Sequence, residues 1–128
     1  MEPIGSMKRL FGQHSEILFA YLYGSVAREE NYKGSDVDIA IFVKEDFTPC
    51  GFYEVNIAEE IERTGLKNVE VVILNGKSLR FLNQVLRYGK LIFSRDEQAR
   101  VSFETKVTKR YIDFKPYYEE YDKMRMST

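Results

Sequence analysis

The chain has 128 residues, the size of one compact domain, with 44% apolar and 30% charged side chains, as in an ordinary folded soluble protein. The net charge of −1, from 19 basic and 20 acidic side chains, argues against a general nucleic-acid coat. One cysteine, Cys50, excludes an intrachain disulfide, and the one histidine, His14, is expected at the surface or the core boundary. Without a membrane-length apolar run or a signal-peptide h-region, the chain is expected to be cytoplasmic.

Hydrophobic periodicity divides the chain into a series of predicted helices and strands. In chain order these are a helix over 4–15, strands over 17–23 and 37–43, a helix over 52–64, a strand over 69–74, a helix over 78–88, a strand over 91–93 and helical sequence from 97 onward. This order predicts a mixed α+β fold: a mixed sheet of about four strands, helices over one face of it, and a C-terminal helical segment, 97–128. The whole chain, 1–128, is expected to be a single domain.

The C-terminal helical segment carries an aromatic stripe and a proline. The stripe residues step by three or four positions and are Phe103, Val107, Tyr111, Phe114, Tyr118 and Tyr121. Such a stripe is more often core or a contact with a partner helix than a ligand site. Pro116 removes a backbone donor and crowds the preceding turn, so we expect a kink or break over 113–116.

Two aspartates open the second predicted strand. Because side chains alternate along a strand, Asp36 and Asp38 should point to the same side, with Val37 between them directed into the core. The near-continuous apolar run that follows, 39–43, suggests a strand buried on both faces. Two neighbouring carboxylates repel each other unless a cation lies between them. We therefore expect Asp36 and Asp38 to hold a metal ion.

Glu70 is the only acidic residue of the third predicted strand. If this strand lies beside the second, Glu70 can face the same metal as the aspartate pair and complete a two-metal site. Magnesium bound in this way leaves coordination positions to water and phosphate oxygens. The alternative is that Glu70 lies at an exposed strand start, next to Lys67 and Asn68. The strand alone leaves both interpretations open.

The crossover between the first two strands contains candidate phosphate ligands. Gly24 lets a phosphate approach the backbone closely. Ser25 offers a hydroxyl and, if one helical turn follows over 26–30, a backbone N–H at the positive end of that turn. Arg28 and Lys33 lie within reach of a polyphosphate, although Lys33 is better explained as a solvated charge. No GxxxxGK[ST] motif is present, so a P-loop is not indicated.

Together these residues form a recognisable pattern. Gly24-Ser25, ten residues, and Asp36-Val37-Asp38 spell G-S-x(10)-D-x-D, which follows an aromatic strand and is completed by Glu70. The pattern resembles that of the minimal nucleotidyltransferases of the DNA polymerase β-like superfamily. The segment 74–96 looks like the helix and short strand that follow the family's third carboxylate. The segment 111–124 looks like the C-terminal part of the family's MntA-like antitoxins.

The resemblance implies a small nucleotidyltransferase fold and an enzyme that uses Mg²⁺ and ATP. The metal-binding and catalytic residues it implies are Asp36, Asp38 and Glu70, with Glu70 also the candidate base. The nucleotide-binding residues it implies are Gly24, Ser25, Arg28 and Ser35. The sequence departs from the family pattern at two places: Glu29-Glu30 follow Arg28 where glycine is common, and the third acid is glutamate where aspartate is more usual.

The resemblance also implies a partner. MntA-like members are antitoxins that transfer AMP to a tyrosine of a HEPN-domain ribonuclease toxin, so we expect a hetero-oligomer with such a toxin and no direct contact with nucleic acid. Two alternatives remain open. One is a non-catalytic antitoxin that acts by binding alone, with the aromatic stripe from Phe103 to Tyr121 as its docking surface. The other is nucleotidyl transfer to a small molecule, which generally needs an added domain.

Overall fold

The structure is a computed structural model that describes residues 3–24 and 36–126. Its elements are α1 (Pro3–Gly12), β1 (Ile17–Tyr23), β2 (Val37–Val43), α3 (Tyr53–Glu62), β3 (Val69–Ile73), α4 (Leu79–Tyr88), β4 (Lys90–Ser94) and α5 (Glu97–Met126). Their types and order are those predicted, and the bounds of β1 and β2 match those predicted. The helical turn predicted over 26–30 lies outside the described residues. Within the described ranges, no helix has both the length and the apolar character needed to cross a membrane.

The strands form one mixed sheet in the order β3-β2-β1-β4. Strand β1 is antiparallel to both β2 and β4, whereas β2 and β3 are parallel. A parallel pair needs a crossover connection, which α3 provides here. The predicted mixed sheet is therefore confirmed, and the order places β2, which follows the acidic pair, between β1 and β3.

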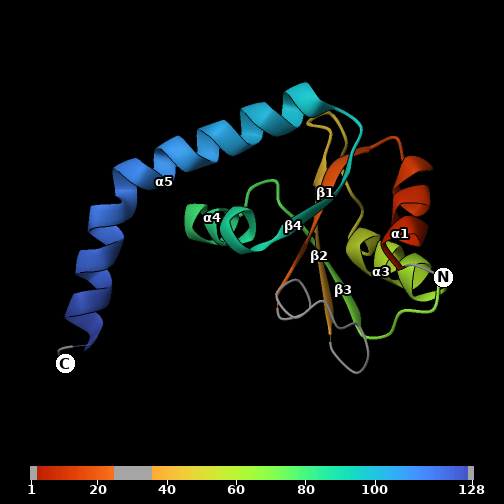
Figure 1. Cartoon of the computed structure of the whole chain (residues 1–128), viewed down its shortest axis with the longest axis horizontal. Coiled ribbons are helices and arrows are strands. Elements are labelled where there is room, and N and C mark those ends of the chain that lie inside the picture. The colour runs from red at the N-terminus through yellow and green to blue at the C-terminus, as the bar shows by residue number, and fades with distance from the viewer. Residues whose placement is uncertain (1–2, 25–35, 127–128) are drawn as a thin grey trace.

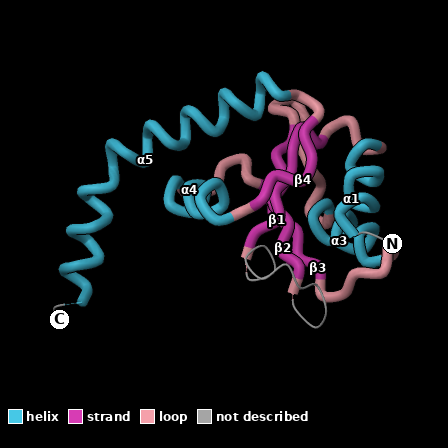
Figure 2. The backbone as a smooth tube through the Cα atoms, in the orientation of Figure 1, coloured by secondary structure: helices cyan, strands magenta, loops and turns pink. Residues whose placement is uncertain are grey.

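Helices cover both faces of the sheet, which corrects the prediction that they lie over one face (Figures 1 and 2). On one face, Ile39 and Ile41 pack in a core cluster with residues of α1 and α3. On the other, Phe19 and Ala40 pack with residues of α4 and the start of α5. Both faces of β1 and β2 are apolar, so each needs a covering layer. The predicted burial of β2 on both faces is confirmed.

Helix α5 is one continuous helix with Pro116 inside it. Figure 1 shows α5 changing direction partway along its length, as expected for a kink at an interior proline. The first part of α5 is attached to the sheet: Phe103 packs in the core, Val107 is buried, and Tyr21 donates a 2.6 Å hydrogen bond from its hydroxyl to Glu104 Oε2. The predicted aromatic stripe is therefore core at its start.

Candidate active site

Three polar side chains lie opposite one another across neighbouring strands at one end of the sheet. Asp38 on β2 pairs with Tyr23 on β1 and with Glu70 on β3. Residues directly opposite in register share a face of the sheet, so the three side chains project to the same side. Tyr23 packs edge-on against Phe81 of α4, with ring centroids 5.7 Å apart, which identifies this side as the α4 face. Strand β3 therefore lies beside β2, which is the condition under which Glu70 was expected to face the same metal ion as the aspartate pair.

The aspartate pair lies at the point where β2 begins. Asp36 is exposed and directly precedes the strand, whereas Val37 is fully buried and Asp38 is half-buried. The backbone N–H of Val37 donates a 3.0 Å hydrogen bond to the carbonyl of Asn68, which ties the start of β2 to the start of β3. Val37 thus enters the core as predicted, and the two carboxylates are left on the open end of the sheet.

The electrostatics of Asp38 fit the predicted repulsion. Burial raises the pKa of the Asp38 carboxyl, and the nearby charges of Glu70 and Asp36 raise it further. Among residues 3–24 and 36–126, no ion pair reaches any of these three carboxylates. No three His, Cys, Asp or Glu side chains in those ranges converge closely enough to make a metal site by themselves. Within the part of the chain that the structure describes, these acids are therefore neighbours without a paired cation, rather than a closed ligand cage.

Gly24 is fixed in this site by two constraints. Its φ angle is +82°, a left-handed conformation that side chains with a Cβ rarely adopt. A Cβ placed on Gly24 would also lie 2.5 Å from Oδ2 of Asp38, well inside contact distance. The backbone of the strand end therefore passes directly beside the Asp38 carboxylate. This contact gives Gly24 a role beside the predicted phosphate approach, since any larger residue would displace Asp38.

Tyr23 is a site residue that the sequence reasoning missed. Burial raises the pKa of its phenol to about 12, with further contributions from the charges of Asp38, Glu70 and Glu54. The phenol is therefore neutral at physiological pH and keeps a proton to donate at the wall of the site. In the sequence, this role of Tyr23 was indicated only by its position directly before Gly24, at the end of β1.

The remaining predicted nucleotide-binding residues are in a segment outside the described residues. They are Ser25, Arg28 and Ser35, together with Lys33 and the departure Glu29-Glu30. Of the predicted site, the structure thus brings together Asp38, Glu70 and Gly24, and places Asp36 at the edge of this group.

Comparisons with known proteins bear on the family and the fold of this chain. A family model described as "Polymerase beta, Nucleotidyltransferase" matches residues 6–98. A search of curated sequences found no significant match. Among solved structures, the chain is similar to one from a toxin–antitoxin complex with AMP-PNP, at 19% identity and a TM-score of 0.78, covering 96% of this chain and 98% of that one.

Two further solved structures show the same likeness over the whole fold. One belongs to an MntA–HepT toxin–antitoxin complex, at 19% identity and a TM-score of 0.74, with 97% of each chain covered. The other belongs to a complex of a tri-AMPylated Shewanella oneidensis HEPN toxin with an MNT antitoxin. It matches at 18% identity and a TM-score of 0.72, covering 98% of this chain and 99% of that one.

Proposed function

The chain belongs to the polymerase β nucleotidyltransferase family, and from this premise we propose that it transfers AMP from ATP to a tyrosine of a partner HEPN ribonuclease toxin. In this role it is a cytoplasmic antitoxin that silences the toxin by covalent modification. The observation that carries the proposal is the alignment of Asp38 with Glu70 on one side and Tyr23 on the other, beside Gly24. A structural protein has no need for acids aligned in this way without a cation.

The acidic side chains fit a magnesium ion. Carboxylate oxygens are the ligands that Mg²⁺ prefers in proteins, usually one or two of them together with phosphate oxygens and water. Burial raises the pKa of Asp38, and the charges of Glu70 and Asp36 raise it further; a cation would relieve this repulsion. Asp36, Asp38 and Glu70 are the residues proposed to hold magnesium, which when bound supplies positive charge next to the phosphates of ATP.

The proposed reaction is an in-line displacement. The tyrosine oxygen of the acceptor forms a bond to the α-phosphorus of ATP, the bond from that phosphorus to the β-phosphate oxygen breaks, and pyrophosphate leaves. The proton of the tyrosine passes to a base, for which Glu70 is the candidate, since it is exposed on β3. Gly24 leaves the backbone open for the phosphates, with Ser25, Arg28 and Ser35 as further proposed phosphate ligands. Catalysis then comes mainly from positioning and electrostatic stabilisation.

The proposal that the acceptor is a protein is supported by the solved structures that share this fold. The matched structures come from complexes of toxin and antitoxin, one with AMP-PNP and one with a tri-AMPylated HEPN toxin. The match to them covers 96–98% of this chain, so it includes α5 as well as the catalytic sheet. A small-molecule acceptor would instead call for an additional domain to enclose it, and the likeness extends over chains of the same size.

The test is a transfer assay with the HEPN-domain toxin encoded beside this chain. We expect label from α-labelled ATP to reach the toxin in the presence of Mg²⁺, and mass spectrometry to place AMP on a tyrosine. Asp38→Asn should abolish labelling, whereas Asp46→Asn, on an exposed loop between β2 and α3, should leave it unchanged. Labelling that survives Asp38→Asn would overturn the assignment of the site. Full inhibition of the toxin without any labelling would favour an antitoxin that acts by binding alone.

A further inference from the structure

The second half of α5 presents a continuous apolar strip to solvent. Phe114, Tyr117, Tyr121 and Met124 have exposed fractions of 45%, 69%, 56% and 64%. Their spacing of three, four and three residues places them along one side of the helix, as in the seam of a helix that packs against another helix. We name these four residues the distal seam.

The other side of the same helix segment is fixed to the body of the protein. Arg80 of α4 donates two hydrogen bonds to the carboxylate of Asp122, of 3.1 and 2.8 Å, and lies 4.9 Å above the ring of Tyr118. Tyr118 in turn stacks on Tyr111, with ring centroids 5.6 Å apart. The predicted aromatic stripe therefore divides: Tyr111 and Tyr118 face α4, whereas Phe114 and Tyr121 belong to the distal seam.

This attachment has an energetic consequence for binding. A partner that packs on the distal seam meets a helix segment already ordered by its contacts with Arg80, so little conformational entropy is lost on association. Large aromatic side chains and methionine are also the residue types enriched in the cores of protein interfaces. A fully formed helix that leaves four such side chains exposed in one row is typical of a binding surface.

The relation of α5 to the family model also supports the interpretation of the distal seam as a binding surface. The family model ends at residue 98, so the catalytic sheet is complete where α5 begins. The chains from toxin–antitoxin complexes match 96–98% of this chain, so nearly all of α5 is shared with them. The helix is therefore an addition to the catalytic fold that occurs in chains crystallised with a protein partner.

We propose that the distal seam docks the protein that accepts the nucleotide, through an apolar helical surface of that protein bordered by basic side chains. This inference rests on the proposed function and adds to it the surface that selects the acceptor. It separates docking, on α5, from chemistry, where β1 ends and β2 begins.

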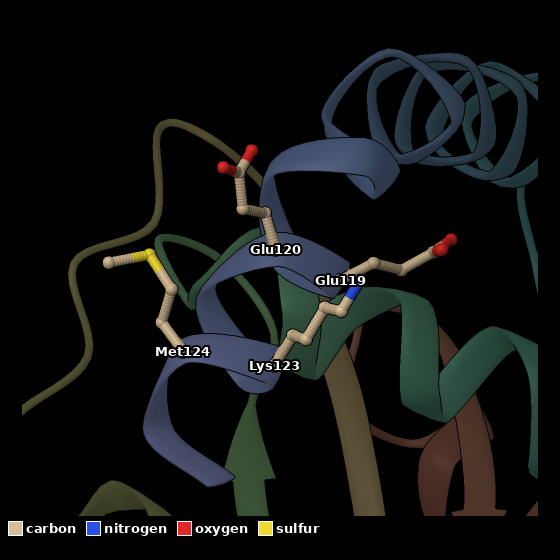
Figure 3. Close-up of a pocket in the computed structure, with 4 residues that line it drawn as sticks. All are labelled: Glu119, Glu120, Lys123 and Met124. Atoms are coloured by element: carbon tan, nitrogen blue, oxygen red, sulfur yellow. The ribbon is translucent and has the colours of Figure 1, made fainter. Parts of the chain in front are cut away.

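Charged residues of both signs lie beside the distal seam, and the acidic ones follow one border of it. Asp113 and Glu120 directly precede Phe114 and Tyr121, so they lie along one border of the seam. Glu119, Glu120, Lys123 and Met124 line a hollow of about 520 Å³ beside the helix, and Figure 3 shows these four side chains on the last turns of α5. A basic side chain of the partner would find carboxylates at this border, which favours a basic rim opposite it, whereas Arg125, 5.8 Å from the centroid of the Tyr121 ring, places a positive charge beside the same seam.

The size of the distal seam argues for an occupant that also reaches the active site. A stable protein interface buries roughly 800 Å² on each partner, and four side chains supply only part of that area. Tyr23 and Asp38 lie on the face of the sheet that α4 and α5 cover. In Figure 1 the second half of α5 lies beyond α4 as seen from the sheet, so an occupant of both surfaces must reach across α4. One protein that touches both surfaces satisfies the area and presents its tyrosine to the site.

The experiment measures docking apart from catalysis. The partner toxin is titrated by calorimetry into a chain carrying Asp38→Asn, with and without Tyr117→Ala and Tyr121→Ala. We expect the two alanines to weaken binding at least tenfold. The matched control is Val101→Ala with Ile112→Ala, which removes side chains that are 50% and 64% exposed on the same helix but away from the seam. The control should change affinity less than twofold.

A second measurement uses the catalytically intact chain. The seam variant should raise the KM for the toxin about tenfold while the KM for ATP and kcat remain unchanged. Equal affinity of seam variant and control would overturn the proposal. A dimer of this chain in sedimentation that dissociates with the seam substitutions would also overturn it, in favour of a second copy as occupant. If the toxin binds through the seam but no AMP is transferred, the proposed function fails while the docking surface stands.

Discussion

Acidic side chains lie beside both ends of β1, and the residues that surround them differ between the two ends. At the start of the strand, His14 lies between two glutamates, with Nδ1 3.0 Å from Glu16 Oε2 and Nε2 3.0 Å from Glu60 Oε1. The hydroxyl of Tyr53 donates a 2.6 Å hydrogen bond to Glu16. At the other end of the strand, Asp38 and Glu70 are neighbours, and no ion pair reaches them from the described parts of the chain.

The pKa values follow this difference. Burial raises the pKa of the Glu16 carboxyl, but hydrogen bonds from Tyr53, the backbone and His14 outweigh burial and lower it overall. Burial also raises the pKa of Asp38, and there the neighbouring acids add to the effect. The charges at the start of β1 are compensated within the chain, whereas Asp38 and Glu70 are paired with no cation of the described residues and mark the end of the sheet where a ligand is expected.

The largest effect expected at the uncompensated end comes from Gly24→Ala. The methyl group would lie 2.5 Å from Asp38 Oδ2, and φ of +82° would be strained. Displacing Asp38 should lower nucleotidyl transfer about 1,000-fold, the scale of losing a preorganised electrostatic group. The assay is transfer of labelled AMP to the toxin. Gly76→Ala is the control, since Gly76 also has φ of +82° but lies in a turn with no atom near its Cβ position. A similar loss in both variants would mean that backbone strain alone explains the result.

The sequence was sufficient to predict the elements and to single out Asp36, Asp38 and Glu70 as candidate site residues. The apolar runs set the strand bounds because burial on both faces leaves little freedom in β1 and β2. The alignment of Glu70 with Asp38 could be stated only as a condition, because strand order depends on the crossover through α3 rather than on the strands themselves. The face that each helix covers also depends on how the chain crosses between strands, so the sequence did not predict helices on both faces.

The division of the aromatic stripe could not be predicted for a related reason. Steps of three and four residues are compatible with one broad stripe, so periodicity treats Tyr111, Phe114, Tyr118 and Tyr121 alike. Which of these residues face α4 is determined by Arg80, which is distant in sequence and contacts Asp122 and the ring of Tyr118. Tyr23 was missed because a tyrosine within an apolar strand is normally interpreted as a core residue. Only the strand pairing shows that it lies opposite Asp38.

At the compensated end, Arg95→Ala should destabilise the fold by about 2 kcal/mol. The guanidinium donates to the carbonyls of Phe11, Gly12, His14 and Ile17, at 2.7 to 3.2 Å. It therefore satisfies carbonyls at the C-terminal end of α1, which have no partner within the helix. Urea unfolding measures the loss. Arg87→Ala, which removes an exposed arginine of α4, should cost less than about 0.5 kcal/mol. Equal losses in both variants would remove the role assigned to Arg95.

The bridge made by His14 should make stability depend on pH. Burial alone would lower the pKa of the imidazole, but Glu60 and Glu16 raise it above its usual 6.5. A raised pKa in the folded state means that the stabilisation is fully present below pH 6.5 and is lost as pH rises through the folded value. We expect a loss of about 1 kcal/mol, the scale of a partly exposed charged hydrogen bond. His14→Gln should flatten this part of the profile, and because His14 is the only histidine, an unchanged slope would contradict the bridge.

The smallest effect tests the comparison directly, because the same kind of substitution should have opposite signs at the two ends. A raised pKa means that the folded state binds a proton more readily than the unfolded state, so ionised Asp38 destabilises the fold above that pKa. Asp38→Asn should therefore raise the free energy of unfolding at pH 7, without divalent ions, by roughly 0.5 kcal/mol. Glu16→Gln should lower it by about 1 kcal/mol, because Glu16 accepts hydrogen bonds from Tyr53 and His14. Urea unfolding of both variants gives the two signs. If Asp38→Asn were as destabilising as Glu16→Gln, the acids at the end of β1 would serve the fold as well, and their arrangement would no longer point to a ligand.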